Sequence, residues 1–176
     1  MICSLLSAPA IAEMTKNRSD LLINLIDEKD VTYVTLSLEF ERASIDYETR
    51  EEGKSLYIIE PGWFPFWCRI NKNSSLIALA TYIPYRDSST ELQRLTLAND
   101  FNRYAFGVTA YVEGDKLKID HILNYKNGLL RENFIRVSRN FSAVITKAIR
   151  DHDPNYELLM PLSEMSSESD NESKSE

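Results

Sequence analysis

The sequence has few of the residues that catalytic and metal sites most often use. Its 176 residues include two cysteines, Cys3 and Cys68, and two histidines, His121 and His152. It contains no Cys/His cluster with metal-ligand spacing, no GxGxxG, no P-loop and no HExxH motif. Neither histidine has Ser, Cys or carboxylate neighbours in the sequence that indicate a catalytic triad. We therefore expect a protein that is not an enzyme and that uses no cofactor or metal ion.

Sequence evidence for disulfides and for export is equally sparse. Two distant cysteines are too few for a disulfide framework, which favours a reducing compartment. Residues 1–12 are apolar and Ala10-Ile11-Ala12 is similar to a signal-peptide cleavage site, but no basic residue precedes this short run. No other stretch approaches the roughly 18 apolar residues of a membrane span. We expect a cytoplasmic protein that does not contact membranes, with export as the less favoured alternative.

Positive charge is scarce, and the negative charge is concentrated at one end. The formal net charge is −7, of which −4 lies in residues 163–176 and −3 in the rest of the chain. Proteins that bind nucleic acid need positive surface, so we do not expect a nucleic acid partner. The Ser- and Glu-rich residues 161–176 have almost nothing to bury and are predicted to form a disordered acidic tail.

The first part of the chain combines one predicted helix with one ambiguous segment. Residues 1–28 are predicted to be a partly helical extension, because residues 15–30 carry a narrow apolar stripe (Leu21, Leu22, Leu25 and Ile26). In residues 31–43, alternation of Leu36, Leu38 and Phe40 fits a strand, whereas the spacing of Tyr33, Leu36, Phe40 and Ala43 fits a helix. Both interpretations remain open on the pattern alone.

The middle and the end of the chain have clearer patterns. Two predicted hairpins, 45–50 with 55–60 and 66–71 with 76–83, supply four strands. A helix over residues 88–104 follows, with Ser88 and Glu91 as its capping box. Strands 106–112 and 116–123 then turn around Gly114-Asp115. A final helix of about six turns is predicted from apolar residues at alternating spacings of 4 and 3 (Leu130, Phe134, Val137, Phe141, Val144 and Ala148).

Two groups of residues are candidates for function. Asn99 and Asn102 continue the line of Leu92 and Leu95, so we expect them to face the sheet and to hydrogen-bond the backbone of the following strand or turn. This makes them a structural polar pair, with contact to a ligand as the alternative. The second group is aromatic, and either it caps the edge of the core or it forms a partly exposed patch that docks a protein. Its members are Trp63, Phe64, Phe66, Trp67, Tyr82 and Tyr85.

Residues 41–149 resemble the YbjN-type domain, a family that shares the architecture of type III secretion chaperones. The matching segments are Ile45-Asp46-Tyr47-Glu48, Asn99-Asp100-Phe101-Asn102, Gly114-Asp115-Lys116-Leu117 and the helix from Leu129. The resemblance favours a helix for residues 31–43 and implies a noncatalytic domain with a regulatory or chaperone-like role. The N-terminal extension and the acidic tail lie outside the family pattern, which leaves a domain over residues 29–160.

Together these patterns predict an α+β fold. Its order is helix, four strands, helix, two strands and helix, with a twisted antiparallel sheet and helices packed mainly on one face. We expect the domain to bind a protein, either a separate partner or a second copy in a homodimer. The alternative is a small-ligand or signal-sensing domain that uses the polar helix face and the aromatic patch.

Overall fold

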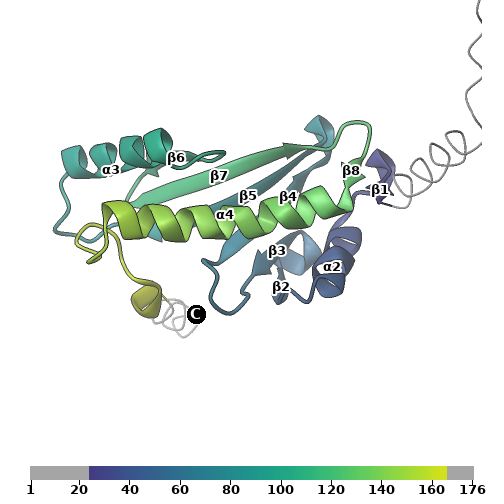
Figure 1. Ribbon diagram of the computed structural model, residues 1–176, viewed down its shortest axis with the longest axis horizontal. Helices are drawn as coiled ribbons and strands as arrows, with labels where there is room; N and C mark the ends of the chain where they lie inside the picture. Colours follow the sequence, from purple (N-terminus) through teal and green to yellow (C-terminus); the bar gives the residue numbers. More distant parts are fainter. Residues whose placement is uncertain (1–23, 166–176) are drawn as a thin grey trace, which may run out of the picture.

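A six-stranded antiparallel sheet organises the chain. The structure is a computed structural model that describes residues 24–165 (Figure 1). The strand order is β2-β3-β4-β5-β7-β6, so β6 and β2 are the two edges. The strands are β2 (Tyr47–Arg50), β3 (Ser55–Ile58), β4 (Phe66–Asn71), β5 (Leu76–Pro84), β6 (Thr109–Glu113) and β7 (Lys116–Asn124). In the described residues, none of the helices combines the length and hydropathy of a transmembrane span.

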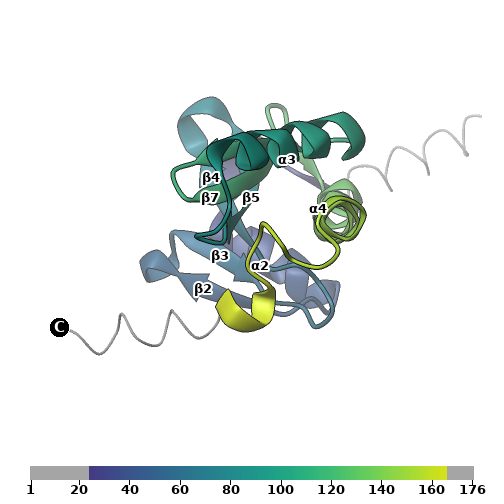
Figure 2. The ribbon, with the colours of Figure 1, turned by 90° about the vertical axis from the view of Figure 1, so that its left-hand side faces the viewer.

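Within residues 24–165, three long helices accompany this sheet and lie mainly on one face of it. They are α2 (Tyr33–Arg42), α3 (Glu91–Tyr104) and α4 (Arg131–His152). The end-on view of Figure 2 shows α4 to one side of the sheet, and Figure 1 shows α3 next to β6, which it contacts. Short 3-10 turns are η1 (Glu28–Asp30), η2 (Glu51–Gly53) and η3 (Lys72–Ser74). The α+β class with an antiparallel sheet is the predicted one.

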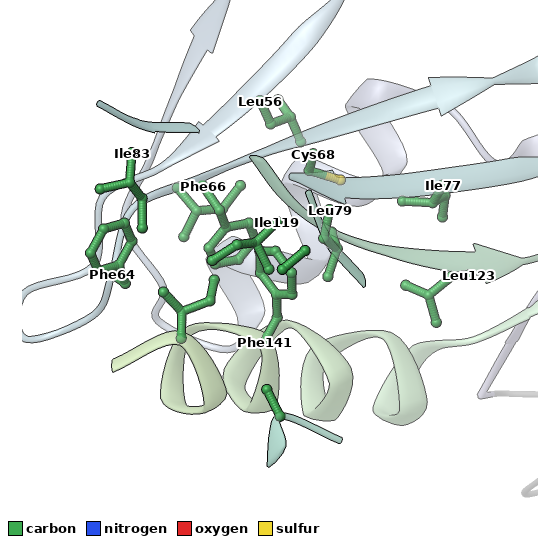
Figure 3. Packing of buried hydrophobic residues seen from close by; sticks show 14 of the residues in the cluster. Leu56, Phe64, Phe66, Cys68, Ile77, Leu79, Ile83, Ile119, Leu123 and Phe141 are labelled. Atoms are coloured by element: carbon green, nitrogen blue, oxygen red, sulfur yellow. The ribbon is translucent and has the colours of Figure 1, made fainter. Parts of the chain in front are cut away.

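The core lies between the sheet and α4. Alternate residues of the central strands, including Phe66, Cys68 and Leu79, point toward the helix and are fully buried (Figure 3). Phe141 of α4 meets the Phe66 ring edge-on at 5.2 Å between ring centroids. Such edge-to-face pairs add to the stabilisation from burial, because the positive ring edge meets the negative ring face. The 22 residues of α4 agree with the predicted six turns, although the helix begins at Arg131.

The ambiguous segment of the sequence is a helix. Leu36 and Phe40 of α2 are fully buried, and Phe40 packs against Phe134 of α4 at 5.1 Å between ring centroids. The Thr32 side chain caps the helix by accepting a hydrogen bond of 3.1 Å from the backbone N–H of Thr35. Packing against α4 thus prevails over the local strand preference of the β-branched residues.

The helix predicted over residues 15–30 is wrong for its described part. Residues Leu25–Ile26 form a short strand, β1, which pairs with β8 (Leu129–Leu130), and the turn η1 follows it. Gly128 allows this pairing, because its φ is +116° and a Cβ there would lie 2.8 Å from Leu25 Cδ1. Residues 15–23 of the predicted helix lie outside the described residues.

The helix α3 forms as predicted, but its cap and its buried face differ from the prediction. The capping box consists of Thr90 and Gln93, two residues after the predicted cap at Ser88. Leu97, Ala98 and Phe101 face the core. Leu92 and Leu95 are 75% and 46% exposed, so the predicted stripe faces solvent.

The end of the described chain packs against the domain. Leu162 and Met165 are partly buried against the core, and the backbone N–H of Met160 donates to the carbonyl of Pro84 at 2.9 Å. Asp153 ends α4, and its buried carboxylate accepts hydrogen bonds from the backbone N–H groups of residues 157–159. Residues 161–165 of the predicted tail therefore belong to the folded body, and residues 166–176 lie outside the described part.

Candidate functional site

The predicted aromatic patch does not form one surface. Phe64, Phe66 and Tyr85 are buried in the core. Trp63 is half-buried against the core and stacks on Phe66 at 6.5 Å between ring centroids. Trp67 and Tyr82, in contrast, lie on the face of the sheet that is turned away from α4, because side chains alternate along β4 and β5. Only these two members remain candidates for docking a protein.

Strand register adds further aromatic residues to this surface. Tyr57 of β3 pairs with Trp67 across the ladder, and their ring centroids are 4.7 Å apart. Tyr82 and Tyr111 flank Lys118 of β7 in a second cross-strand row. Ile122 lies on the same face of β7 and is 50% exposed. We call these residues the outer face: Tyr57, Trp67, Tyr82, Tyr111, Lys118, Ile122 and Arg69.

The two cations of the outer face, Arg69 and Lys118, are paired within the chain. The Arg69 guanidinium lies 5.0 Å from the Trp67 ring centroid and forms an ion pair of 2.7 Å with Glu51. Lys118 lies 5.3 Å from the Tyr82 ring and 5.2 Å from the Tyr111 ring, and its Nζ is 3.5 Å from Glu113. The hydrogen bond to Tyr111 raises the pKa of Lys118, so the ammonium stays charged over the physiological range. This leaves a surface that is aromatic and close to neutral.

The two predicted asparagines, Asn99 and Asn102, also have different environments. Both residues are exposed in the folded chain, so the expectation that Asn99 faces the sheet is wrong. Asn102 reaches the edge strand β6, where its Nδ2 donates to the Ala110 carbonyl and its Oδ1 accepts from the Ala110 N–H, both at 2.7 Å. This contact with the following strand is the one that the spacing indicated. Asn102 is therefore placed to join α3 to the sheet.

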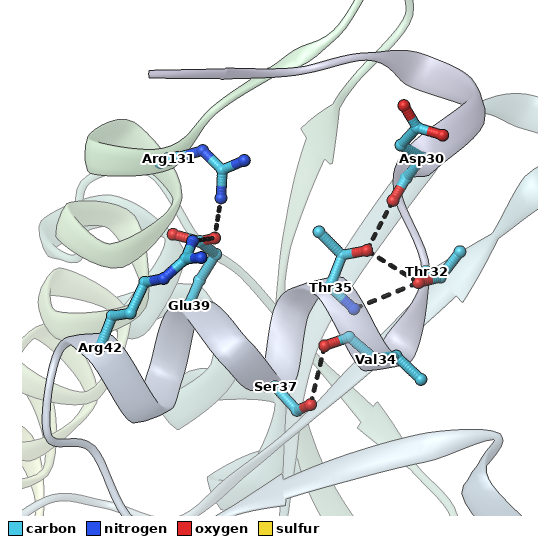
Figure 4. Close-up of polar contacts among 8 residues, drawn as sticks. All are labelled: Asp30, Thr32, Val34, Thr35, Ser37, Glu39, Arg42 and Arg131. Atoms are coloured by element: carbon cyan, nitrogen blue, oxygen red, sulfur yellow. Dashed lines mark hydrogen bonds and ion pairs between the residues drawn. The ribbon is translucent and has the colours of Figure 1, made fainter. Parts of the chain in front are cut away.

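A groove between α2 and α4 was not anticipated from the sequence. Its volume is about 840 Å³. We call it the arginine groove, after the side chains that line it: Arg42 from α2, and Arg131, Arg136 and Arg139 from α4. Buried Glu39 accepts hydrogen bonds from Arg42, at 2.6 Å, and from Arg131 (Figure 4). The sequence signal was weak, because arginines on a helix surface are common and the facing helix was unknown.

The histidines and Cys68 make packing contacts within the fold. His121 contacts the Gly107 carbonyl through its ring nitrogen, and His152 stacks on Tyr104 at 5.1 Å between ring centroids. Cys68 is fully buried, and desolvation raises the pKa of its thiol. The high pKa makes this cysteine a poor nucleophile. Cys3 lies outside the described residues. Within residues 24–165, no group of three or more His, Cys, Asp or Glu side chains is arranged to hold a metal ion.

Comparisons with known proteins agree with this fold. Residues 32–151 match a family model named YbjN and described as "Putative bacterial sensory transduction regulator". Among solved structures, the chain is similar to YbjN from E. coli, described as "a putative transcription regulator", with a TM-score of 0.60 and 19% identity. The match covers 72% of this chain and 94% of that one. A comparison with curated proteins found no match.

Proposed function

Since this chain belongs to the YbjN family, we propose that it is a noncatalytic regulatory or chaperone-like domain that acts by binding another protein. The observation that carries the proposal is the outer face, where Tyr57, Trp67, Tyr82 and Tyr111 lie together on strands. None of these four rings belongs to the core cluster or to the residues packed against it. Rigid aromatic side chains of this kind dominate binding energy at protein interfaces.

The occupant that best fits the outer face is an apolar polypeptide segment of a partner protein. Arg69 and Lys118 already have carboxylate partners in the chain, so neither cation is free to select an acidic ligand. Asp120, on the same face of β7, accepts a hydrogen bond of 3.4 Å from the Tyr111 hydroxyl. A sheet surface with aromatic rings on neighbouring strands suits apolar side chains of a bound segment. Regulation or chaperoning would follow from covering that segment. We further propose a cytoplasmic location, which the predicted reducing environment supports.

An array of short peptides tests this proposal with the full-length chain. We expect the wild-type protein to bind peptides rich in aromatic and aliphatic residues, with little dependence on their net charge. The double variant Trp67→Ser/Tyr82→Ser should bind these peptides at least about tenfold more weakly, since two interface anchors are lost. Phe106→Ser is the matched control, because Phe106 is 95% exposed but lies in the α3–β6 loop, away from the outer face.

Three results would contradict the proposal. The double variant could bind as the wild type does, or Phe106→Ser could lose binding equally, which would indicate nonspecific adhesion. The third result would come from light scattering. If the wild type were a dimer and the double variant a monomer, the occupant of the outer face would be a second copy of the chain. Thermal melting of each variant separates lost binding from lost folding.

The second candidate function is the sensing of a small ligand. It is favoured by the arginine groove, whose volume of about 840 Å³ suits a small molecule.

A further inference from the structure

The arginine groove carries a local positive excess in an acidic chain. Its lining includes four guanidinium groups and two carboxylates, those of Glu39 and Glu132, which leaves a formal charge of +2. The whole chain has a net charge of −7. Three of these arginines lie in the first three turns of α4 and the fourth on the facing helix α2, and the Glu39 carboxylate offsets part of the charge of Arg42 and Arg131. An anion in the groove would offset the charge that remains around Arg136 and Arg139.

Contacts within the chain hold three of the four arginines in place. Glu39 is 4% exposed, and its carboxylate accepts hydrogen bonds from both Arg42 and Arg131 (Figure 4). Arg139 donates to the carbonyl of Ala43 at 3.3 Å, which satisfies one of the carbonyl groups at the C-terminal end of α2. Arginines that are already oriented lose less side-chain entropy when a ligand binds.

Arg136 is the least constrained of the four. Its Nη2 donates to the Asn133 side chain at 2.7 Å, an exposed contact within α4. The groove covers the first three turns of α4, and at the first turn, next to Arg131, the helix dipole also favours negative charge. An anion in the groove would lie among Arg131, Arg136 and Arg139, which all line it from α4.

We propose that the arginine groove binds a small organic phosphate, in the form of a phosphomonoester. A phosphomonoester carries about −1.5 to −2 charges at neutral pH, which matches the surplus of the groove, whereas a single carboxylate would leave it half neutralised. Guanidinium groups bind phosphate oxygens in pairs. Ala43 and Ile135 give the organic part of the ligand an apolar wall, and the volume of about 840 Å³ is that of a small-molecule site. This site does not depend on the outer face.

Isothermal titration of the full-length chain with phenyl phosphate at low ionic strength tests the proposal. We expect one site, and we expect Arg136→Gln and Arg139→Gln each to weaken binding about tenfold by removing a charge-assisted hydrogen bond. Arg150→Gln is the matched control, because its side chain is 71% exposed on the same helix but outside the groove. It should change the affinity by less than about twofold.

Benzoate serves as the carboxylate analogue and should bind at least about tenfold more weakly than phenyl phosphate. The proposal is overturned if phenyl phosphate gives no heat of binding at millimolar concentration, if Arg150→Gln weakens binding as much as Arg136→Gln, or if benzoate binds equally well. The double variant Trp67→Ser/Tyr82→Ser should keep full affinity for phenyl phosphate. Failure of the peptide experiment and failure of this one are therefore distinguishable.

Discussion

The two faces of the sheet differ although they are made by the same strands. On β7, Ile119 is fully buried beneath α4, whereas Ile122, three residues later, is 50% exposed on the outer face. The inner face is filled by residues that pack into α4, and the outer face carries rings and paired charges. Alternation along a strand therefore separates the side chains that stabilise the fold from those that we propose for recognition, so each set can be changed without the other.

Among the variants that test this difference between the two faces, Ile119→Thr should lower the free energy of unfolding most. The change removes a buried methyl group and places a hydroxyl group in an apolar core, which should lower the free energy of unfolding by about 2–4 kcal/mol. Urea denaturation followed by circular dichroism measures it. A loss below about 0.5 kcal/mol would mean that the inner face is not the main source of stability.

Asn102→Leu should have the next largest effect. It removes both hydrogen bonds to Ala110 and leaves that backbone N–H and C=O without the amide, so the free energy of unfolding should fall by about 1–3 kcal/mol. Asn99→Leu on the same helix is the control and should stay within about 0.5 kcal/mol of the wild type, because Asn99 is exposed. Equal melting of the two variants would refute a structural role for Asn102.

Alkaline pH should lower the free energy of unfolding through the deprotonation of buried Tyr85. Burial raises the pKa of Tyr85 to about 12 from its ordinary value of 10.0. The folded state therefore holds this proton more tightly than the unfolded state does. The resulting stabilisation is complete below pH 10.0 and is lost as the pH rises through about 12. Tyr85→Phe should make the free energy of unfolding decline less between these pH values, as measured by urea denaturation, and an unchanged decline would contradict the assignment.

The smallest effect on stability is expected from Ile122→Thr. The side chain is half-exposed and threonine keeps the β-branched shape, so the free energy of unfolding should change by no more than about 0.5 kcal/mol. Peptide binding, measured on the same array as for Trp67, should nevertheless decrease. A destabilisation as large as that of Ile119→Thr would abolish the distinction between the two faces.

The fold was predictable from the sequence where the apolar residues of a helix indicated only one possible buried face. The repeat of apolar residues in α4 predicts one face of the helix, on which Phe134 and Phe141 are buried and the two valines are partly buried. Leu130, the first member of the repeat, lies in β8 and is 45% exposed. In α3 two apolar sets compete, one with Leu92 and Leu95 and one with Leu97 and Phe101. Position relative to β6 and α4 decides between them, and a periodicity within the helix carries no information about that position.

The candidate sites were less predictable, because they are assembled by tertiary contacts. Glu39 and Arg131 are 92 residues apart in the chain, so the arginine groove has no local signature. The aromatic patch was anticipated from composition, yet strand alternation sends Phe66 inward and Trp67 outward. The position of α4 determines which face of the sheet is the core, and the pattern within a single strand does not contain that position.

The amide of Asn102 has one more consequence for this molecule. An edge strand with free N–H and C=O groups is a template on which another chain can add a strand, and such addition leads to fibrils. At Ala110 the side chain of Asn102 takes the position that an added strand would need. Assembly by strand addition is thereby discouraged along β6, and a variant that lacks this amide would be prone to polymerise there. Asn102 thus protects the β6 edge of the sheet, while the outer face stays available for the association that we propose.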